Sequence, residues 1–170
     1  GVEARLVPAA GIPFTSFEAS GFDRAHLASL PKGVAKIAAS TAKARRWFRE
    51  IEPDVVVGFG GYVSIPVARA AEKAGIPVVL HEQNSVMGMA NKYLAKKAAA
   101  LCLTYECPGC DLPASTPVHL TGNPVRRSVI EADRAAGRAL FDLAEDDFML
   151  LVFGGSLGAR HINEAVCALK

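Results

Sequence analysis

Several kinds of feature are scarce in this sequence, and each shortage excludes a class of protein or of site. The net charge at pH 7 is only +2, and aromatic residues make up 7% of the 170 residues. A dedicated nucleic-acid-binding protein gathers basic residues on one face and often stacks bases on aromatic side chains, so no nucleic-acid partner is expected. No segment approaches the roughly 20 consecutive apolar residues of a membrane-spanning helix.

Cysteine is also scarce, with four residues in all. Cys107 and Cys110 have the spacing of a redox pair or of half a zinc site. Zinc would need further ligands, and only His119 lies close in the sequence. A redox pair of the thioredoxin type would open a helix, whereas Pro113 and Pro117 follow here. We therefore expect a loop with reduced thiols and no metal.

The two ends of the sequence have the pattern of a cut chain. The first five residues lack the basic start and the apolar stretch of a secretory signal peptide. There is no initiating methionine, and the last residues have the pattern of a helix interior. We expect an internal segment of a longer protein.

What the sequence has is the composition of a folded domain, with 51% hydrophobic and 21% charged residues. Short Val- and Leu-rich runs alternate with helical patterns, as in βαβ units with a parallel sheet. The expected elements are a strand at 12–17, a helix at 32–51, a strand at 54–58, a helix at 63–74, a strand at 78–80, a helix at 88–98 and strands at 100–104 and 118–120. Within the helix at 63–74, Ser64 is the expected N-cap and Gly75 the expected stop.

A second α/β unit is expected after the turn chemistry of Thr121-Gly122-Asn123-Pro124. Its elements would be a helix at 132–143, a strand at 148–153 and a helix from Ala159. We therefore expect a domain over 1–126, a linker at 122–127 and the start of a second domain over 127–170.

Three polar or glycine-rich motifs follow apolar runs. They are Gly60-Gly61-Tyr62, His81-Glu82-Gln83-Asn84 and Gly154-Gly155-Ser156. In an open parallel sheet, ligands bind outside the carboxyl ends of the strands, so these loops are the expected sites.

The loop from Gly154 to Ala159 would join a strand to a helix. Glycines allow close backbone approach, and a helix start offers free N–H groups, so a diphosphate is the natural ligand. Ser156 would add a hydroxyl donor. The alternative is a tight turn capped by Ser156 without a ligand.

In the second motif, Glu82 could act as a general base, and an amide such as Asn84 could hold sugar hydroxyls. The alternative is that these side chains cap the following helix. Gly60-Gly61-Tyr62 is read equally well as a substrate loop or as a structural turn. Arg126 could pair with phosphate, or be an ordinary exposed cation.

The helix at 32–51 has six basic residues and one acid. Its apolar residues recur at helical spacing and are expected to face inward: Val34, Ile37, Ala44, Phe48 and Ile51. The basic outer face is by default a solvated surface, and an anionic lipid surface is the alternative.

Taken together, four motifs resemble the MurG family of peptidoglycan glycosyltransferases in order and spacing. They are residues 53–64, ending in Gly-Gly-Tyr-Val-Ser; His81-Glu82-Gln83-Asn84; Thr-Gly-Asn-Pro-Val-Arg at 121–126; and Gly-Gly-Ser-Leu-Gly-Ala-Arg at 154–160. The resemblance covers nearly the whole chain. It implies a GT-B fold, in which two Rossmann-like domains with parallel sheets face each other across a cleft. Here the later part of the first domain and the start of the second are present.

The resemblance also implies the reaction. N-acetylglucosamine would move from UDP-GlcNAc to the 4-hydroxyl of the muramyl sugar of lipid I, giving lipid II with inversion at the anomeric carbon. The implied donor-binding positions are Asn84, Arg126, Gly155, Ser156 and Gly158. No metal or cofactor is implied, because a helix start and an arginine can stabilise the departing UDP.

On the acceptor side, the implied positions are Gly60, Gly61, Tyr62 and Ser64. Glu82, His81 and Tyr62 are the catalytic candidates, with the base unassigned. The family works at the cytoplasmic face of the bacterial membrane as a peripheral protein, which favours lipid contact by the basic helix.

Two departures from the family pattern stand out. Its first glycine-rich loop and the later half of the donor domain are absent, so we expect the 170 residues alone to be inactive. Leu157 stands where many members carry Gln. The alternatives are a GT-B transferase with another lipid acceptor, such as a diacylglycerol, or a non-catalytic nucleotide-binding Rossmann module. A dinucleotide-dependent enzyme fits poorly, because no Gly-x-Gly-x-x-Gly with a later acid occurs.

Overall fold

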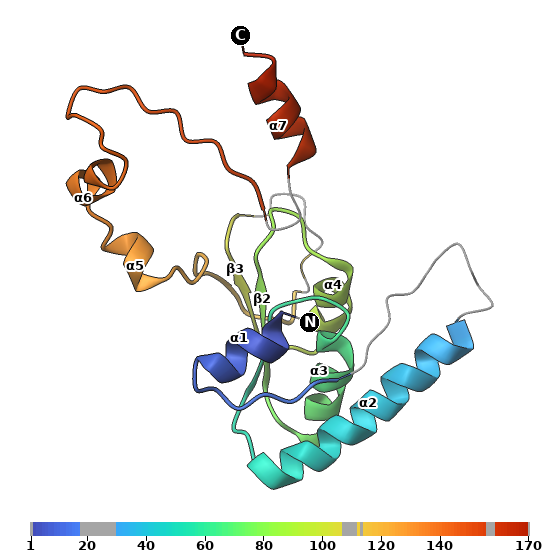
Figure 1. The fold of residues 1–170 in the computed structure, drawn as a ribbon. Coiled ribbons are helices and arrows are strands. Elements are labelled where there is room, and N and C mark those ends of the chain that lie inside the picture. Colours follow the sequence, from blue (N-terminus) through green and yellow to red (C-terminus); the bar gives the residue numbers. More distant parts are fainter. Residues whose placement is uncertain (1, 18–29, 107–111, 113, 156–158, 170) are drawn as a thin grey trace. The chain divides into compact units, whose positions relative to one another are not determined.

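The structure is a computed structural model that describes residues 2–17, 30–106, 112, 114–155 and 159–169. The chain divides into two compact units, Gly1–Pro124 and Val125–Lys170, which are drawn in Figure 1 and described here one at a time. The Cys107 and Cys110 pair lies outside the described residues, so the expectation for these thiols stays a prediction.

A four-stranded parallel sheet forms the centre of the first unit, as the sequence predicts. Its order is β1-β2-β3-β4. The strands are β1 (Val56–Gly58), β2 (Val78–Glu82), β3 (Ala100–Leu103) and β4 (Val118–Leu120). β2 is longer than predicted, because His81 and Glu82 pair in register with Cys102 and Leu103. The motif expected to follow β2 therefore begins inside it.

Helices connect these strands and cover one face of the sheet. α3 (Ser64–Ala74) links β1 to β2, and α4 (Met89–Ala95) links β2 to β3. α2 (Leu30–Ile51) packs against α3 as an outer layer (Figure 1). The core forms between these layers from small, branched and aromatic side chains, among them Ala44, Phe48, Ala68, Ala71, Leu80, Leu94 and Leu101.

The two ends of α3 test the predicted N-cap and the predicted stop of this helix. Gly75 ends the helix with φ +74°, a left-handed conformation that glycine adopts without steric cost. Ser64 is not the N-cap, contrary to prediction. It is the first helical residue, and its hydroxyl instead donates a hydrogen bond to the Gly60 carbonyl.

α2 confirms the predicted helix but only part of its predicted apolar face. Ala44 and Phe48 are buried, and Ile37 is half-buried, whereas Val34 and Ile51 are exposed. Ile51 is the last residue of the helix. The buried positions also include Ser40 and Thr41, and the Thr41 hydroxyl donates to the Ile37 carbonyl. A threonine whose hydroxyl is hydrogen-bonded to the carbonyl one helical turn earlier can therefore occupy a buried position on the inner face of a helix.

The start of the chain differs from the prediction. Residues 12–17 form no strand, and a helix that the sequence reading missed, α1 (Glu3–Ala9), precedes them. Ile12 is 57% exposed, and none of the described residues pairs with this apolar run as a strand.

The described residues of the second unit form the short helices α5 (Arg127–Ile130), α6 (Arg134–Ala139) and α7 (Arg160–Cys167). The predicted helix at 132–143 is confirmed only over α6, where the Asp133 side chain caps the first turn by accepting from the Ala136 N–H. The predicted strand at 148–153 is wrong for this structure. Its side chains are exposed, Phe148 by 89%, and none of the described residues pairs with them.

Candidate functional site

Two loops meet at the carboxyl end of β1 and β2. One is the β1–α3 loop, which contains Gly60, Gly61 and Tyr62, and the other is the β2–α4 turn, which contains Asn84 and Gly88. Together they line a cavity of about 240 Å³. The sequence placed ligand binding at this edge of the sheet, and the cavity lies there.

Glu82, the last residue of β2, is buried beneath the turn that follows it. Its Oε1 accepts hydrogen bonds from the backbone N of Asn84 (3.1 Å) and from Asn84 Nδ2 (2.9 Å). Its Oε2 accepts from the backbone N of Gly88 (2.9 Å) and from Asn91 Nδ2 (2.9 Å). Each carboxylate oxygen therefore has two donors.

The charge of Glu82 follows from these contacts. Burial acts to raise the pKa of the Glu82 carboxyl, but the hydrogen bonds from Gly88, Asn91 and Asn84 outweigh burial and hold this pKa below its usual value. The group is therefore an ionised hydrogen-bond acceptor at neutral pH.

His81 is engaged on both ring nitrogens. Its Nε2 lies 2.9 Å from the carbonyl oxygen of Gly122, and its Nδ1 lies 3.0 Å from Gln83 Nε2. A carbonyl can only accept, so Nε2 carries the proton and Nδ1 accepts from Gln83. The ring also packs against Phe59, with centroids 5.5 Å apart. His81 does not line the cavity; it ties β2 to the turn after β4.

The β1–α3 loop depends on glycine. Gly60 and Gly61 have φ of +81° and +76°, which L side chains rarely adopt. Tyr62 follows with 47% of its surface exposed and lines the cavity. Ser64, the fourth predicted acceptor-side residue, points its hydroxyl back to Gly60 and does not line the cavity.

Asn91 is a cavity residue that the sequence reading missed. It is 1% exposed on α4, and its Nδ2 donates to Glu82 and to the His81 carbonyl. Its Oδ1 is buried without a hydrogen-bond partner among the described residues. One signal was available: an asparagine shares the buried stripe of α4 with Leu94 and Ala95.

The predicted donor-binding residues of the second unit are described in part. Arg126, at the N-cap of α5, and Gly155 are exposed. At Gly154, an added Cβ would lie 2.3 Å from the Cβ of Ala159, so a side chain there would force the backbone to move. Ser156 and Gly158 lie outside the described residues, and the roles assigned to them stay predictions.

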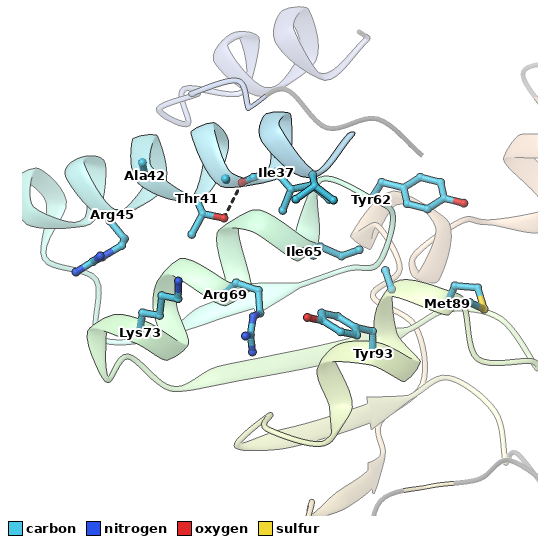
Figure 2. A pocket seen from close by; sticks show the side chains of 13 residues that line it. Ile37, Thr41, Ala42, Arg45, Tyr62, Ile65, Arg69, Lys73, Met89 and Tyr93 are labelled. Carbon is cyan, nitrogen blue, oxygen red and sulfur yellow. Dashed lines mark hydrogen bonds between the residues drawn. The ribbon is translucent and has the colours of Figure 1, made fainter. Parts of the chain in front are cut away.

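A larger groove, of about 610 Å³, lies between α2, α3 and α4. Figure 2 shows Ile37 and Thr41 of α2 facing Ile65 and Arg69 of α3, with Tyr93 of α4 nearby. Arg45 and Lys73 lie toward one end of the groove, and Tyr62 and Met89 toward the other (Figure 2).

The cations of this groove differ in their contacts. The Arg69 guanidinium pairs with Glu72 and lies over the Tyr93 ring, 5.9 Å from its centroid. Arg45 and Lys73 have no acidic partner among the described residues. The groove is therefore apolar inside and positively charged at one end.

Two kinds of feature are absent from the described residues. No helix among them has the length and apolar character of a membrane span. No group of three or more His, Cys, Asp or Glu side chains among them is placed to hold a metal ion.

The chain is similar in sequence to known proteins. The chain is 44% identical over 167 residues to a Parabacteroides distasonis protein named UDP-N-acetylglucosamine–N-acetylmuramyl-(pentapeptide) pyrophosphoryl-undecaprenol N-acetylglucosamine transferase, covering 97% of this chain and 45% of that protein. It is 40% identical over 168 residues to the protein of the same name from Lactiplantibacillus plantarum, covering 99% of this chain and 46% of that protein. The chain thus spans less than half the length of these curated relatives.

A solved structure is also similar in fold. The crystal structure of MurG from Acinetobacter baumannii matches 76% of this chain and 36% of that chain, with a TM-score of 0.57 and 34% sequence identity. The profile of the glycosyltransferase family 28 N-terminal domain matches residues 1–102. The resemblance read from the four motifs is confirmed, and the chain belongs to glycosyltransferase family 28 as a homologue of MurG.

Proposed function

We propose that this chain is part of an inverting transferase that moves N-acetylglucosamine from UDP-GlcNAc to the 4-hydroxyl of lipid I, giving lipid II in peptidoglycan synthesis. The observation that carries the proposal is the cavity where the Gly60-Gly61-Tyr62 loop meets the Asn84 turn at the carboxyl end of a parallel sheet. The relatives at 40–44% identity are named for this transfer.

Within this proposal, the two units have different roles. Residues 1–126 would be the later part of the acceptor and membrane-side domain of a GT-B protein, and residues 127–170 the start of the UDP-sugar domain. Both domains would be Rossmann-like. A chain limited to these 170 residues would then be inactive in transfer, since it lacks most of the second domain.

The donor-binding residues would be Asn84 in the first unit and Arg126, Gly155, Ser156 and Gly158 in the second. An exposed arginine can pair with a diphosphate oxygen, and an amide can hold a sugar hydroxyl. Departure of UDP would then be stabilised without a metal or cofactor.

On the acceptor side, Gly60 and Gly61 would allow close backbone approach, with Ser64 holding the loop through the Gly60 carbonyl. Of the three catalytic candidates, Tyr62 has an exposed side chain on the cavity, whereas Glu82 and His81 are buried and fully hydrogen-bonded. We assign Tyr62 to substrate contact and leave the base unassigned.

The groove between α2, α3 and α4 is the proposed contact with the membrane surface, which would place the protein at the cytoplasmic face of the membrane. Its apolar lining and the cations Arg45 and Lys73 match the acyl and anionic headgroup parts of a lipid surface. Sedimentation with anionic phosphatidylglycerol vesicles should show binding of the protein. R45E/K73E should weaken this binding, whereas R127E, on the second unit, should leave it unchanged.

The transfer itself is tested in the full-length protein that contains this chain. Calorimetry should show binding of UDP-GlcNAc and none of NAD, and lipid I should be converted to lipid II. Arg126→Ala and Ser156→Ala should each lower kcat/KM at least about tenfold, on the order of 1.4 kcal/mol. Binding of NAD in place of UDP-GlcNAc would reject the proposal. Transfer to diacylglycerol and not to lipid I would show that the proposed acceptor is wrong.

A further inference from the structure

The Glu82 carboxylate is placed to organise its surroundings. A general base needs an oxygen lone pair that is open to the proton it removes. Here each oxygen already accepts two hydrogen bonds at 2.9–3.1 Å, and the residue is only 2% exposed. Taking up a proton would break at least one of these bonds.

The oxygen Oε1 fixes the amide of Asn84. It accepts from both the backbone N and the side-chain Nδ2 of Asn84, so the side chain is held at two points. Because Nδ2 faces Glu82, the orientation of the amide is set, and Oδ1 is left as the acceptor that Asn84 offers. Asn84 itself is exposed and lines the cavity.

The oxygen Oε2 fixes the other side of the same turn. It accepts from the N–H of Gly88, the residue before α4, and from Asn91 Nδ2 in the first turn of that helix. The carboxylate from β2 therefore holds Gly88, the N-cap residue of α4, and the Asn91 side chain. Glu82 thus joins the sheet, the turn and the helix around one negative charge.

We propose that Glu82 is a positioning residue, which holds the Asn84 amide so that Asn84 Oδ1 accepts a hydrogen bond from a hydroxyl of the transferred sugar. Glu82 then acts through Asn84 on sugar binding and does not receive the proton of the acceptor hydroxyl. This inference rests on the proposed function, because it takes UDP-GlcNAc as the ligand of Asn84.

The test separates the sugar from the nucleotide. In the full-length protein, the Kd of UDP-GlcNAc and the Kd of UDP are measured by calorimetry for Glu82→Gln. Glutamine has one NH₂ group, which must face two of the four donors in either orientation. We expect the Kd of UDP-GlcNAc to rise at least about tenfold, or roughly 1.4 kcal/mol, with the Kd of UDP unchanged.

A double-mutant cycle shows whether Glu82 acts through Asn84. Asn84→Ala should weaken the binding of UDP-GlcNAc as Glu82→Gln does. The double variant should bind UDP-GlcNAc with a Kd no higher than that of the single variant with the higher Kd. Glu50→Gln is the matched control. Glu50 is exposed on α2 and lines neither the cavity nor the groove, so the same chemical change is made away from the site. The UDP-GlcNAc affinity of this variant should equal that of the wild type.

A second variant leaves Glu82 untouched, in case Glu82→Gln does not fold. Asn84→Asp, at an exposed position, keeps an oxygen able to accept from a hydroxyl but loses the Nδ2 donor and places a second carboxylate beside Glu82. The inference expects at least about tenfold weaker UDP-GlcNAc binding. If a held amide were not needed, the aspartate would bind the sugar as well as asparagine does.

Three results would overturn the inference while leaving the proposed function intact. They are wild-type UDP-GlcNAc affinity in Glu82→Gln together with lost turnover, additive losses in the double variant, and wild-type affinity in Asn84→Asp. A wild-type protein that binds UDP but not UDP-GlcNAc would instead reject the proposed function.

Discussion

The two units of this chain contain similar apolar runs but treat them differently. In the first unit, Val78–Glu82 pairs with a strand on each side, and Leu80 is fully buried. In the second, residues 148–153 have an equally apolar pattern, yet they form no strand and remain exposed. A strand is stabilised by its neighbours, so the same local pattern gives a core in one place and an open segment in the other.

The largest effect should come from matched leucine truncations in the two units. Leu80→Ala removes a side chain that is 0% exposed and should lower the free energy of unfolding by about 3 kcal/mol. Leu150→Ala, at a position that is 63% exposed, should change it by less than about 0.5 kcal/mol. Urea unfolding followed by circular dichroism measures both. Equal losses would show that the 148–153 segment is packed in solution.

A smaller effect is expected for two glutamates, and it should depend on pH. Glu82→Gln leaves buried donors without acceptors and should cost about 2 kcal/mol at pH 7. Because hydrogen bonds hold the folded pKa of Glu82 below its ordinary value of about 4.3, the carboxylate stabilises the fold above that value. This stabilisation is lost as the pH falls through the folded pKa.

The difference between wild type and Glu82→Gln should therefore shrink in acid, as urea midpoints at neutral and strongly acidic pH would show. Glu131→Gln is the control in the second unit, where the exposed pair with Arg127 (3.4 Å) is worth less than about 1 kcal/mol at any pH. A Glu82→Gln deficit that is the same at all pH values would contradict the stated charge of this carboxyl.

The smallest effect should come from adding a methyl group to glycines that have free space. Gly61→Ala forces alanine into φ +76° and should destabilise the first unit by about 1 kcal/mol, although nothing lies within 4 Å of the new Cβ. Gly137→Ala in α6 also meets open space, but without a positive φ, and should leave the unfolding midpoint of the first unit unchanged. An unchanged midpoint for Gly61→Ala would show that the loop adopts another conformation.

The sequence predicted the βαβ part of the fold well, because its signals are local. Gly75 and Pro77 mark the end of α3 and the approach to β2, and both act within a few residues of their own position. The strand predicted at 12–17 failed for the same reason as the one at 148–153. Local pattern cannot say whether a neighbouring strand is present.

The candidate site was predicted in its location but not in its contacts. Glu82 and Asn84 were named from a motif, yet their mutual hydrogen bonds and the part played by Asn91 and Gly88 depend on how β2 meets α4. A polar motif shows which functional groups are present. Tertiary packing decides whether a carboxylate such as Glu82 is free to take up a proton or already accepts its full set of hydrogen bonds.

The bond from His81 to the Gly122 carbonyl has a mechanical consequence. Together with the N–H groups of Thr121 and Gly122, which both donate to the Leu103 carbonyl, it anchors the chain just before the first unit ends at Pro124. The polypeptide therefore leaves this unit from a point that is hydrogen-bonded to β2, the strand that carries Glu82. A substitution at His81 would remove the side-chain bond to Gly122 and so loosen the exit of the chain from the first unit.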